Sequence, residues 1–252
     1  MIPPVVILAG GRASRLGGGD KGLRMLCGET VLARIIDRLG YVPSPAPRER
    51  EGPAQREGEG SAASQAEGRL RASPSSGSLR SPPSPAMQEK EGGAPLRIAI
   101  NANGDPSRFV QFGLPVLPDP VDGLPGPLAG VLAAMEWAGE GLVATVPGDA
   151  PFLPRDLLIR LAAAREAAGT KIAVAMSDGR IHPVVALWPA RLAAELREAL
   201  IKEGLRKVES WIDRYPAIRV DFPLSPVDPF FNVNRPEDLA EAERLCRLHP
   251  SL

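Results

Sequence analysis

The chain opens with VVILAGGRASRLGGGDKG at residues 5–22, where an apolar, β-branched run changes abruptly into a glycine-rich loop. The apolar part, 5–9, has the composition of a strand that is buried on both faces of a parallel sheet. The loop holds six glycines, two arginines and one lysine. Successive backbone N–H groups and nearby cations in such a loop can bind phosphate groups. The stretch therefore predicts an α/β fold with a phosphate-binding loop at the end of a buried strand.

Two well-known phosphate-binding motifs do not fit this loop. A P-loop has a glycine directly before its lysine and Ser or Thr directly after it, whereas Lys21 follows Asp20 and precedes Gly22. The pattern G-x-G-x-x-G does occur at 17–22, but it begins eight residues after Ala9 instead of at the strand end, where a dinucleotide-binding fold needs it. Both interpretations are therefore rejected.

Two interpretations of the loop remain. In the first, Gly10 and Gly11 let the backbone approach a ligand while Arg15 and Lys21 counter phosphate charge. In the second, the loop is merely a flexible connection. Glycine loses more conformational entropy on folding than any other residue, so this composition is a costly way to make a connection. The combination with clustered cations favours ligand binding.

The composition excludes several classes of protein. Of 252 residues, 44% are hydrophobic, and 30 basic residues balance 30 acidic ones, which leaves no field for nucleic acid or an anionic membrane surface. No segment reaches the roughly 18 apolar residues of a membrane-spanning helix, and no basic region of a signal peptide precedes the first apolar run. Cys27 and Cys246 stand in no metal-binding or redox spacing. We expect a soluble, cytoplasmic protein with reduced thiols.

The composition changes sharply between residues 43 and 95. This segment is rich in Pro, Ser, Gly, Glu, Arg and Ala, and it contains no Val, Ile, Phe, Tyr or Trp. Burial of so few apolar side chains cannot offset the entropy of ordering the segment. We interpret 43–95 as a disordered insertion, with a regulatory or partner-binding arm as the alternative. Without it, about 200 residues remain, which suits one α/β domain.

Outside the insertion, strands and helices alternate. The pattern predicts strands at 4–9, 96–100, 116–117, 142–146 and 217–222, and helices at 30–39, from Pro127, from Pro154, at 189–203, at 205–214 and from Pro236. Thr30 is an expected N-cap and Gly40 an expected C′ residue. Asp178-Gly179 between 171–176 and 182–188 is a strong hairpin signal. We predict a mostly parallel sheet with an antiparallel hairpin and helices on both faces.

Two aspartates follow predicted parallel strands directly. Asp119 and Asp149 each lie just past a strand end, at the edge where open α/β sheets bind ligands. Either residue alone is typical of a turn or a helix cap. Beside a phosphate-binding loop, however, they indicate Mg²⁺, which is commonly held by one or two carboxylates and substrate phosphates. Asn101 and Asn103 end another strand at the same edge and are candidates for base or ribose recognition, with turn formation as the alternative.

The histidines support no other catalytic chemistry. His182 precedes Pro183 at the start of a predicted strand, and His249 lies near the C-terminus. We find no Ser/His/Asp or Cys/His arrangement and no metal-ligand spacing.

Eight short motifs in order resemble those of the molybdenum cofactor guanylyltransferases, within the wider nucleotidyltransferase family. The resemblance spans nearly the whole chain outside the insertion. The motifs are Leu8-Ala9-Gly10-Gly11, Arg15-Leu16-Gly17-Gly18 with Asp20-Lys21-Gly22, Asn101-Ala102-Asn103, Asp119, Pro125-Gly126-Pro127-Leu128-Ala129-Gly130, Pro147-Gly148-Asp149-Ala150-Pro151, His182-Pro183, and Phe231-Asn232-Val233-Asn234-Arg235-Pro236-Glu237-Asp238-Leu239.

The resemblance implies a single Rossmann-like nucleotidyltransferase domain and assigns roles to its residues. The implied contacts with GTP come from Leu8, Ala9, Gly10, Gly11 and Lys21, with Asn101 and Asp119 at the nucleoside and Asp149 at Mg²⁺. Arg15, Lys21 and Asp149 are the implied catalytic residues, and His182, Asn232 and Asn234 are implied on the pterin side. The Gly10-Gly11 pair resembles the guanylyl branch, since the cytidylyl branch tends to have Ala-Gly there. The main departure from the family pattern is the 43–95 insertion.

The implied reaction is attack by the phosphate of molybdenum-molybdopterin on the α-phosphorus of GTP, with pyrophosphate as the leaving group. It requires no protein nucleophile, so positioning and charge neutralisation would supply catalysis. The implied partners are GTP, molybdenum-molybdopterin, and proteins that deliver molybdopterin or accept the product. The alternatives are a cytidylyltransferase or sugar-phosphate nucleotidyltransferase and, in another class, a carrier of the cofactor that performs no chemistry.

Deletion of residues 45–93 tests the interpretation of the insertion. Because the segment has little apolar surface to bury, we expect the shortened chain to melt within a few degrees of the parent. Differential scanning calorimetry measures both melting temperatures. A large decrease would show that the segment contains an ordered element.

Overall fold

The first predicted strand, β1 (Val5–Leu8), lies inside a seven-stranded sheet in the computed structural model. The structure describes residues 2–10, 20–40, 96–121, 123 and 126–250, and the predicted insertion at 43–95 lies outside them. The strand order is β5-β4-β1-β6-β8-β7-β9. The other strands are β4 (Ile98–Asn101), β5 (Val116–Leu117), β6 (Leu142–Pro147), β7 (Ile172–Ser177), β8 (Arg180–Pro189) and β9 (Ala217–Asp221).

The strand directions confirm the predicted mixed sheet. β1 pairs in parallel with β4 and β6, β4 with β5, and β7 with β9, whereas β8 runs antiparallel to both β6 and β7. The four neighbouring strands β5, β4, β1 and β6 therefore end at one edge of the sheet, as the sequence predicted. Open α/β sheets place their ligands at this carboxyl edge.

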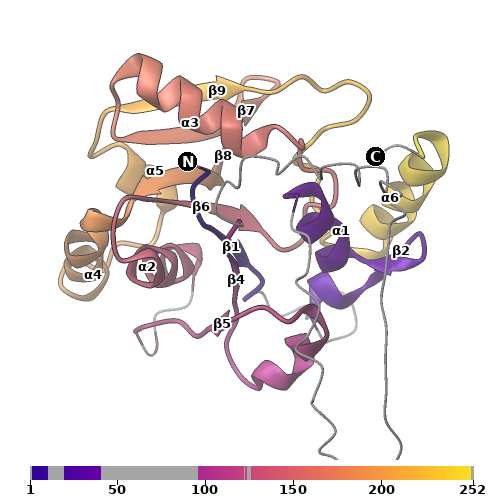
Figure 1. Ribbon diagram of the computed structural model, residues 1–252, viewed down its shortest axis with the longest axis horizontal. Helices are drawn as coiled ribbons and strands as arrows, with labels where there is room; N and C mark the ends of the chain where they lie inside the picture. The colour runs from indigo at the N-terminus through magenta and orange to yellow at the C-terminus, as the bar shows by residue number, and fades with distance from the viewer. Residues whose placement is uncertain (1, 11–19, 41–95, 122, 124–125, 251–252) are drawn as a thin grey trace, which may run out of the picture. The chain divides into compact units, whose positions relative to one another are not determined.

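Helices pack on both faces of the sheet, as predicted (Figure 1). On one face, α2 (Pro127–Ala138), α4 (Ala193–Ile201) and α5 (Val208–Ile212) bury side chains with Val6, Ala99 and Val143. The other core contains residues of α1 (Val31–Arg38), α3 (Leu157–Ala168) and α6 (Pro236–Leu248), together with Phe109 of the 3₁₀ helix η3 (Pro106–Phe112). Each face of the sheet thus has its own apolar core.

Local sequence signals explain several element ends. The Thr30 side chain accepts a hydrogen bond from the Ala33 N–H (3.1 Å) at the start of α1, and Gly40 follows the helix with φ +79°. Asp178 and Gly179 have φ values of 48° and 69°, as a type I′ hairpin turn requires. Both the caps and the hairpin confirm the predictions made from these residues.

Some predicted boundaries were wrong. Residues 154–156 form turns, so α3 begins at Leu157 and not at Pro154. The predicted helix at 189–203 is divided into a 3₁₀ turn, η4 (Ala190–Leu192), and α4, while only Val208–Ile212 of 205–214 is helical. Before α3 the Leu157 N–H donates to the Pro154 carbonyl (3.1 Å), which closes a turn, and after α5 the Arg214 N–H donates to the Trp211 carbonyl (3.2 Å).

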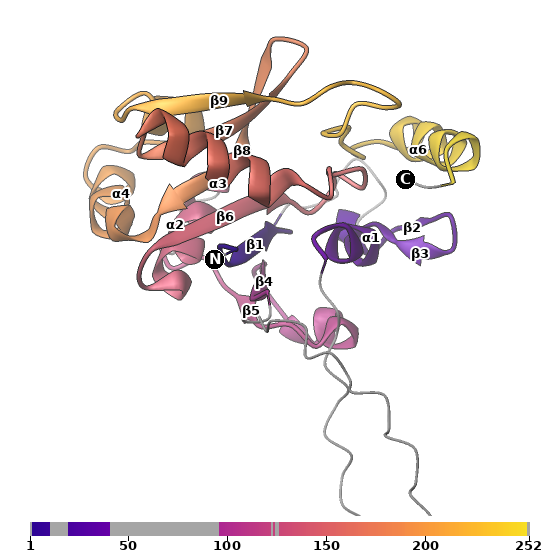
Figure 2. The same ribbon diagram turned by 45° about the horizontal axis from the view of Figure 1, so that its top comes forward.

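A small hairpin between β2 (Met25–Leu26) and β3 (Glu29–Thr30) was not predicted from the sequence. Its turn consists of Cys27 and Gly28, both with positive φ (51° and 94°). Figures 1 and 2 both show α6 beside this hairpin, with which it makes contact. The hairpin thereby joins the segment after the glycine-rich loop to the last helix.

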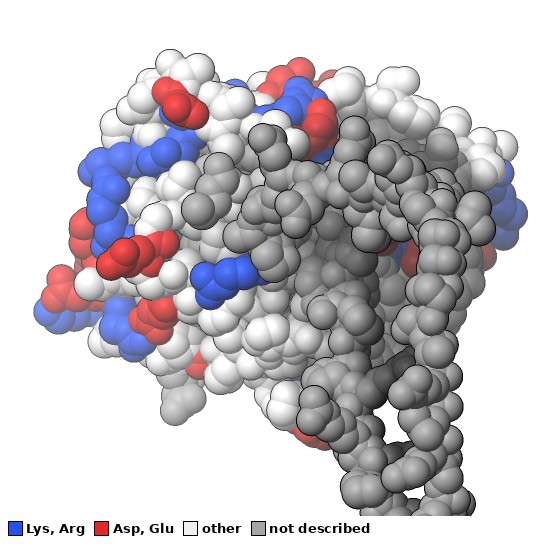
Figure 3. Space-filling model, viewed as in Figure 1, with Lys and Arg blue, Asp and Glu red and all other residues white. Residues whose placement is uncertain are grey.

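Charged side chains are interspersed on the face shown in Figure 3, where blue and red groups of the described residues alternate. Three of the ion pairs in the α2, α4 and α5 region are Arg197–Glu136, Lys202–Glu198 and Arg214–Glu203. On this face the described residues form no broad field of one sign. Within the described residues, no helix is both long and apolar enough to cross a membrane.

A buried polar contact joins β6 to β8. The Thr145 hydroxyl donates to the Val184 carbonyl (2.7 Å) and accepts from the indole N–H of Trp188 (2.8 Å). Thr145 and Trp188 are fully buried. These bonds satisfy two polar groups in a core where water cannot replace the lost partner.

Substitution of Thr145→Val should destabilise the protein by about 1–3 kcal/mol, because it leaves the Trp188 N–H and the Val184 carbonyl without this partner. Urea denaturation measures the change. Thr170→Val is the matched control, since the Thr170 hydroxyl bonds the Ile172 carbonyl (3.1 Å) at a half-buried position. An equal effect at both sites would contradict the importance of the buried contact.

Candidate active site

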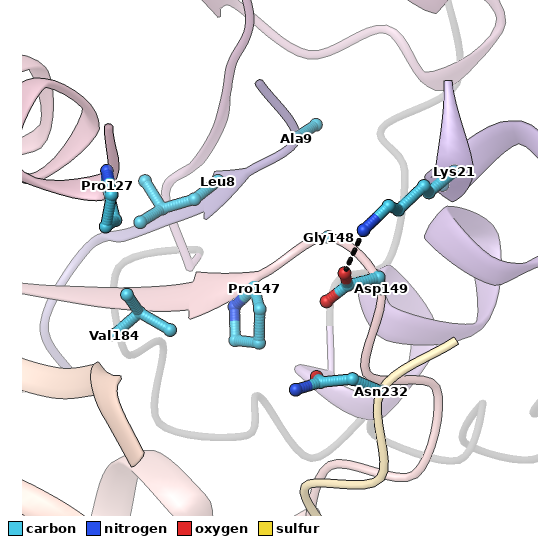
Figure 4. Close-up of a pocket in the computed structure, with 10 residues that line it drawn as sticks. Leu8, Ala9, Lys21, Pro127, Pro147, Gly148, Asp149, Val184 and Asn232 are labelled. Atoms are coloured by element: carbon cyan, nitrogen blue, oxygen red, sulfur yellow. Dashed lines mark hydrogen bonds and ion pairs between the residues drawn. The ribbon is translucent and has the colours of Figure 1, made fainter. Parts of the chain in front are cut away.

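A cavity of about 240 Å³ opens at the carboxyl ends of β1 and β6. Figure 4 shows two chemically different ends. Leu8, Pro127, Pro147 and Val184 form an apolar side, and Lys21, Asp149 and Asn232 lie on the polar side. The other lining residues are Ala9, Gly22 and Gly148. A binding site that combines an apolar wall with a few converging polar groups can both bury and orient a small ligand.

The polar end is centred on Lys21. This residue starts the short 3₁₀ helix η2 (Lys21–Leu23), and its ammonium group lies 3.4 Å from Asp149 Oδ2 (Figure 4). It also donates a hydrogen bond to the side-chain oxygen of Asn234. The Lys21 and Asp149 side chains are 23% and 21% exposed, so solvent still reaches the pair. The structure thus joins the end of the glycine-rich loop to the aspartate after β6.

Close backbone packing brings these residues together. The Gly148 N–H donates to the Leu8 carbonyl (2.9 Å), and a Cβ atom on Gly148 would lie 3.1 Å from the Ala9 Cα. A Cβ on Gly22 would lie 3.0 Å from the Gly148 carbonyl oxygen. These two glycines therefore serve the packing of three backbone segments against one another.

The environment of Asp149 opposes its ionisation. Burial raises the pKa of the Asp149 carboxyl above its usual value, while the charge and hydrogen bond of Lys21 lower it and offset part of the effect. Burial dominates the balance. A carboxylate held in this way gains from an additional cationic ligand, because a positive charge offsets its desolvation.

The segment with Asn232 and Asn234 is attached to the site from the C-terminal side. The Val233 N–H donates to the Asp149 carbonyl (2.8 Å). The Asp238 carboxylate accepts from the N–H groups of Asn234 and Arg235, both at 2.8 Å, and so caps the start of α6. These contacts place Asn234 on Lys21 and Asn232 in the cavity wall. Their predicted contact with a pterin stays a prediction.

A second polar group gathers at the ends of β4 and β5. The Asp119 carboxylate accepts from the side-chain N–H groups of Asn101 (3.0 Å) and Asn103 (2.7 Å), and the Asp119 N–H donates to the Asn103 side-chain oxygen (2.8 Å). Asn101 is 4% exposed and also donates to the Leu117 carbonyl (3.0 Å). The network fixes the Asp119 side chain beside the strand ends.

Gly130 of α2 leaves room for Asn101 next to β1. A Cβ atom on Gly130 of α2 would lie 2.4 Å from the Asn101 side-chain oxygen and 2.9 Å from Leu8 Cδ2. A Cβ on Gly10 would lie 3.8 Å from the same oxygen. Asn101 therefore lies between the start of α2 and Gly10, the residue that follows Ala9. The structure thus places Asn101 and Asp119 close to the nucleotide-binding candidates Leu8, Ala9 and Gly10.

The remaining predicted site residues are His182, Gly11 and Arg15. His182 is not among the residues that line the cavity. Its ring hydrogen-bonds the Ser177 hydroxyl (2.7 Å) and packs on Phe230 at a centroid distance of 4.4 Å, and burial lowers its pKa. Gly11 and Arg15 lie outside the described residues. Their predicted roles stay predictions.

Three contributors to the site were not predicted from the sequence. Val184 lines the cavity, Asp238 holds the Asn234 backbone, and Arg108 binds both oxygens of Asp20, the residue before Lys21. The capping pattern at 235–238 could have identified Asp238, because an acidic residue three positions after an N-cap accepts its N–H. Arg108 and Val184 stand in no recognisable local pattern.

The fold and the site together define an α/β domain whose cavity lies at the carboxyl edge of the parallel strands, beside a cation, a carboxylate and an amide-rich group. A family model described as "MobA-like NTP transferase domain" matches residues 5–46 and 91–217. The chain belongs to this family, and within it to the molybdenum cofactor guanylyltransferases, as its curated relatives indicate.

Two of these relatives are similar over almost their whole length. The molybdenum cofactor guanylyltransferase of Rhodopseudomonas palustris (strain BisB5) is 44% identical over 248 residues, which cover 96% of this chain and 93% of the relative. That of Bradyrhizobium sp. (strain ORS 278) is 42% identical and covers 97% and 93%. The crystal structure of molybdopterin-guanine dinucleotide biosynthesis protein A from Archaeoglobus fulgidus, at 21% identity, shares the fold with a TM-score of 0.61 over 97% of this chain and 99% of that chain.

The Asp149→Asn variant should have the same free energy of unfolding at pH 7 as the parent, or one that is higher by up to about 1 kcal/mol. The reason is that burial makes the ionised carboxylate less favourable in the folded state than in the unfolded state. A raised folded pKa means that the folded chain binds the proton more readily than the unfolded chain. The stability contributed by Asp149 therefore falls as pH rises from the unfolded pKa, 3.8, through the raised folded pKa. The advantage of the variant should shrink as pH falls through this window.

Urea denaturation between pH 4 and pH 7 measures this difference. Asp156→Asn is the control, since the Asp156 side chain is 58% exposed and pairs only at 3.9 Å with Arg160. A variant at position 149 that is less stable than the parent at pH 7, and recovers in acid, would show instead that the ion pair with Lys21 stabilises the fold.

Proposed function

We propose that this chain transfers GMP from GTP to the phosphate of molybdenum-molybdopterin, which forms the guanine dinucleotide form of the molybdenum cofactor and pyrophosphate. The observation that carries the proposal is the Lys21–Asp149 pair in the cavity at the ends of β1 and β6. Curated relatives that are 36–44% identical over nearly the full chain and bear the name molybdenum cofactor guanylyltransferase support this choice of reaction.

The proposed reaction is a phosphoryl-type substitution with no protein nucleophile. An oxygen of the molybdopterin phosphate forms a new bond to the α-phosphorus of GTP, and the bond from that phosphorus to the bridging oxygen of the β-phosphate breaks. The electron pair of the broken bond leaves with pyrophosphate. The attacking oxygen is already anionic, so the protein's task is to position the two substrates and to stabilise negative charge.

Lys21 is suited to bind the triphosphate. An ammonium group has three N–H donors, and in the described part of the chain Asp149 and Asn234 accept two of them. A third donor is available for a phosphate oxygen. Because Asn234 is held by Asp238, the ammonium is positioned before the ligand binds, so little reorganisation is needed when charge develops.

The amide-rich group is suited to bind the nucleoside. Asn101 and Asn103 orient the Asp119 carboxylate, whose remaining lone pairs can accept hydrogen bonds from a ligand. Guanine presents an amino donor, N2, that such a carboxylate can accept. The backbone of Leu8, Ala9 and Gly10 lies between this group and Lys21, where the proposal places the sugar and phosphates. Gly11 and Arg15 are proposed to extend the same binding loop.

The donor set at Asp149 fits Mg²⁺ that also binds substrate phosphates. Asp149 and Asn232 bring oxygen ligands to one cavity, which hard cations prefer. Among the described residues, no group of three or more His, Cys, Asp and Glu side chains could hold a metal by itself. One carboxylate with phosphate oxygens and water is a common arrangement for Mg²⁺. When bound, the ion supplies charge neutralisation at the phosphates.

His182, Asn232 and Asn234 are proposed on the pterin side, with Asn232 supported by its place in the cavity wall. Proteins that deliver molybdopterin or accept the product are the proposed protein partners, and the proposed location is the cytoplasm.

The proposal predicts which nucleoside triphosphate is consumed. The purified chain is incubated with Mg²⁺, molybdenum-loaded molybdopterin and each of GTP, CTP, ATP and UTP, and pyrophosphate and dinucleotide are measured. We expect both products with GTP and a decrease of about 10²-fold or more with Asp149→Asn or with excess EDTA, reversed by added Mg²⁺ only in the parent.

The controls separate the parts of this prediction. Asp156→Asn should retain the activity of the parent, since Asp156 lies outside the cavity. Products with CTP but not GTP would overturn the guanylyl assignment. Full activity in EDTA, or in the Asp149→Asn variant, would remove the metal role of Asp149.

A further inference from the structure

We infer that Arg108 is a positioning residue for the proposed reaction, because it connects the end of the glycine-rich loop to the segment that holds Asp119. The inference rests on the proposed function and extends it to a residue outside the cavity wall. Arg108 belongs to η3, and Asp20 lies 88 positions earlier in the chain, directly before Lys21. The guanidinium group makes hydrogen bonds to both regions at once.

On one side, Arg108 forms a charge-assisted contact with Asp20. Nη1 donates to Asp20 Oδ1 (2.9 Å) and to Oδ2 (2.7 Å). The side chains of Asp20 and Arg108 are 12% and 34% exposed, so solvent screens this pair less than a fully exposed one. Two contacts to one carboxylate, together with the other bonds of the same guanidinium, restrict the orientation of Asp20. Asp20 is fixed by its side chain, and Lys21 is the next residue.

On the other side, Arg108 holds the backbone that follows β4. Nη2 donates to the Asn103 carbonyl (2.6 Å), and Nε donates to the Asp105 carbonyl (2.8 Å). Asn103 in turn exchanges two hydrogen bonds with Asp119. The guanidinium also lies over the ring of the buried Phe109, 5.1 Å from its centroid. Arg108 therefore fixes the segment that orients Asp119.

The geometry links the nucleoside group to the phosphate group through one side chain. The connection runs from Asp119 through Asn103 and Arg108 to Asp20 and the neighbouring Lys21. A displacement of the base-binding segment would move Asp20, and with it the start of η2. Arg108 also neutralises the negative charge of Asp20, which would otherwise oppose a phosphate ligand near Lys21. When a nucleotide occupies the base site, Lys21 is therefore already positioned to bind its phosphates.

Kinetics of four variants test this role. Asp20→Asn keeps the size of the side chain but removes its charge, Arg108→Met removes the guanidinium, and Arg108→Lys keeps a charge without the planar group that makes the four contacts. The fourth variant combines Asp20→Asn with Arg108→Met. Arg214→Met is the matched control, because Arg214 also binds both oxygens of a carboxylate, Glu203, on a part of the surface away from the cavity.

We expect each single variant to lower kcat/KM for GTP by about 10- to 100-fold, since small displacements of positioned groups have effects of this size. Both KM for GTP and kcat should change, whereas partial unfolding would lower kcat alone by reducing the active fraction. The double variant should be no worse than Arg108→Met, because both changes break the same contact. Circular dichroism and the melting temperature of Asp20→Asn should match those of the parent, and Arg214→Met should retain full activity.

The outcomes distinguish this inference from the proposed function. If the parent turns over GTP while Asp20→Asn and Arg108→Met stay within twofold of it, or if their effects multiply in the double variant, the positioning role is overturned alone. If the parent turns over CTP instead of GTP, the guanylyl assignment fails, and the same comparison is made with CTP. If the parent turns over no nucleotide with molybdopterin, the proposed function fails, and the role of Arg108 fails with it.

Discussion

The site depends on a close approach of backbone at the ends of β1 and β6. Gly148 donates to the Leu8 carbonyl, and neither Gly148 nor Gly22 has room for a Cβ atom without a shift of neighbouring backbone. Three segments that are far apart in the sequence thereby contact one another. Side chains attached next to them, Lys21 and Asp149, then lie within reach of each other at the carboxyl edge of the sheet. Gly22 and Gly148 therefore serve the packing of the backbone, independently of any contact with a ligand.

Burial makes the ionised form of Asp149 less favourable, and binding of a positively charged ligand can offset this effect. Burial opposes ionisation of Asp149, and Lys21 offsets only part of this effect. Because such a carboxylate has limited contact with water, its ionised form becomes more favourable when positive charge and phosphate oxygens enter the site together. The same logic explains the second group, where Asn101 and Asn103 satisfy Asp119 with neutral donors and leave its charge available. Preorganisation of this kind is the usual means of stabilising charge during transfer reactions.

Much of the fold could be predicted because its signals are local. Thr30, Gly40 and the Asp178-Gly179 turn each act through one or two neighbouring residues, and β1 is recognisable from its apolar composition. The β2–β3 hairpin escaped prediction because two-residue strands show no alternation, and its turn contains Cys27, which is not a typical residue at positive φ. Pro154 marked a helix start wrongly because proline also fits the turn that precedes α3.

The candidate site was predictable in part for the same reason. Asp119 and Asp149 could be placed because parallel strands end together, so positions after strand ends converge without knowledge of side-chain contacts. The pairs Lys21–Asn234 and Asp20–Arg108 join residues 213 and 88 positions apart, and no periodicity or spacing reports such contacts. The sequence therefore predicted which residues lie at the carboxyl edge of the sheet, but not the hydrogen bonds between their side chains.

The contact between Lys21 and Asn234 has a consequence for how the protein is made. Lys21 is synthesised 213 residues before Asn234, and the Asp238 that holds Asn234 follows later still. The central strands of the sheet can pair before then, since β1, β4 and β6 all precede residue 148. A ribosome-bound chain can thus possess its central sheet while the ammonium group still lacks one of its two partners. The polar site is therefore complete only after the segment that contains Asn234 and Asp238 has been synthesised.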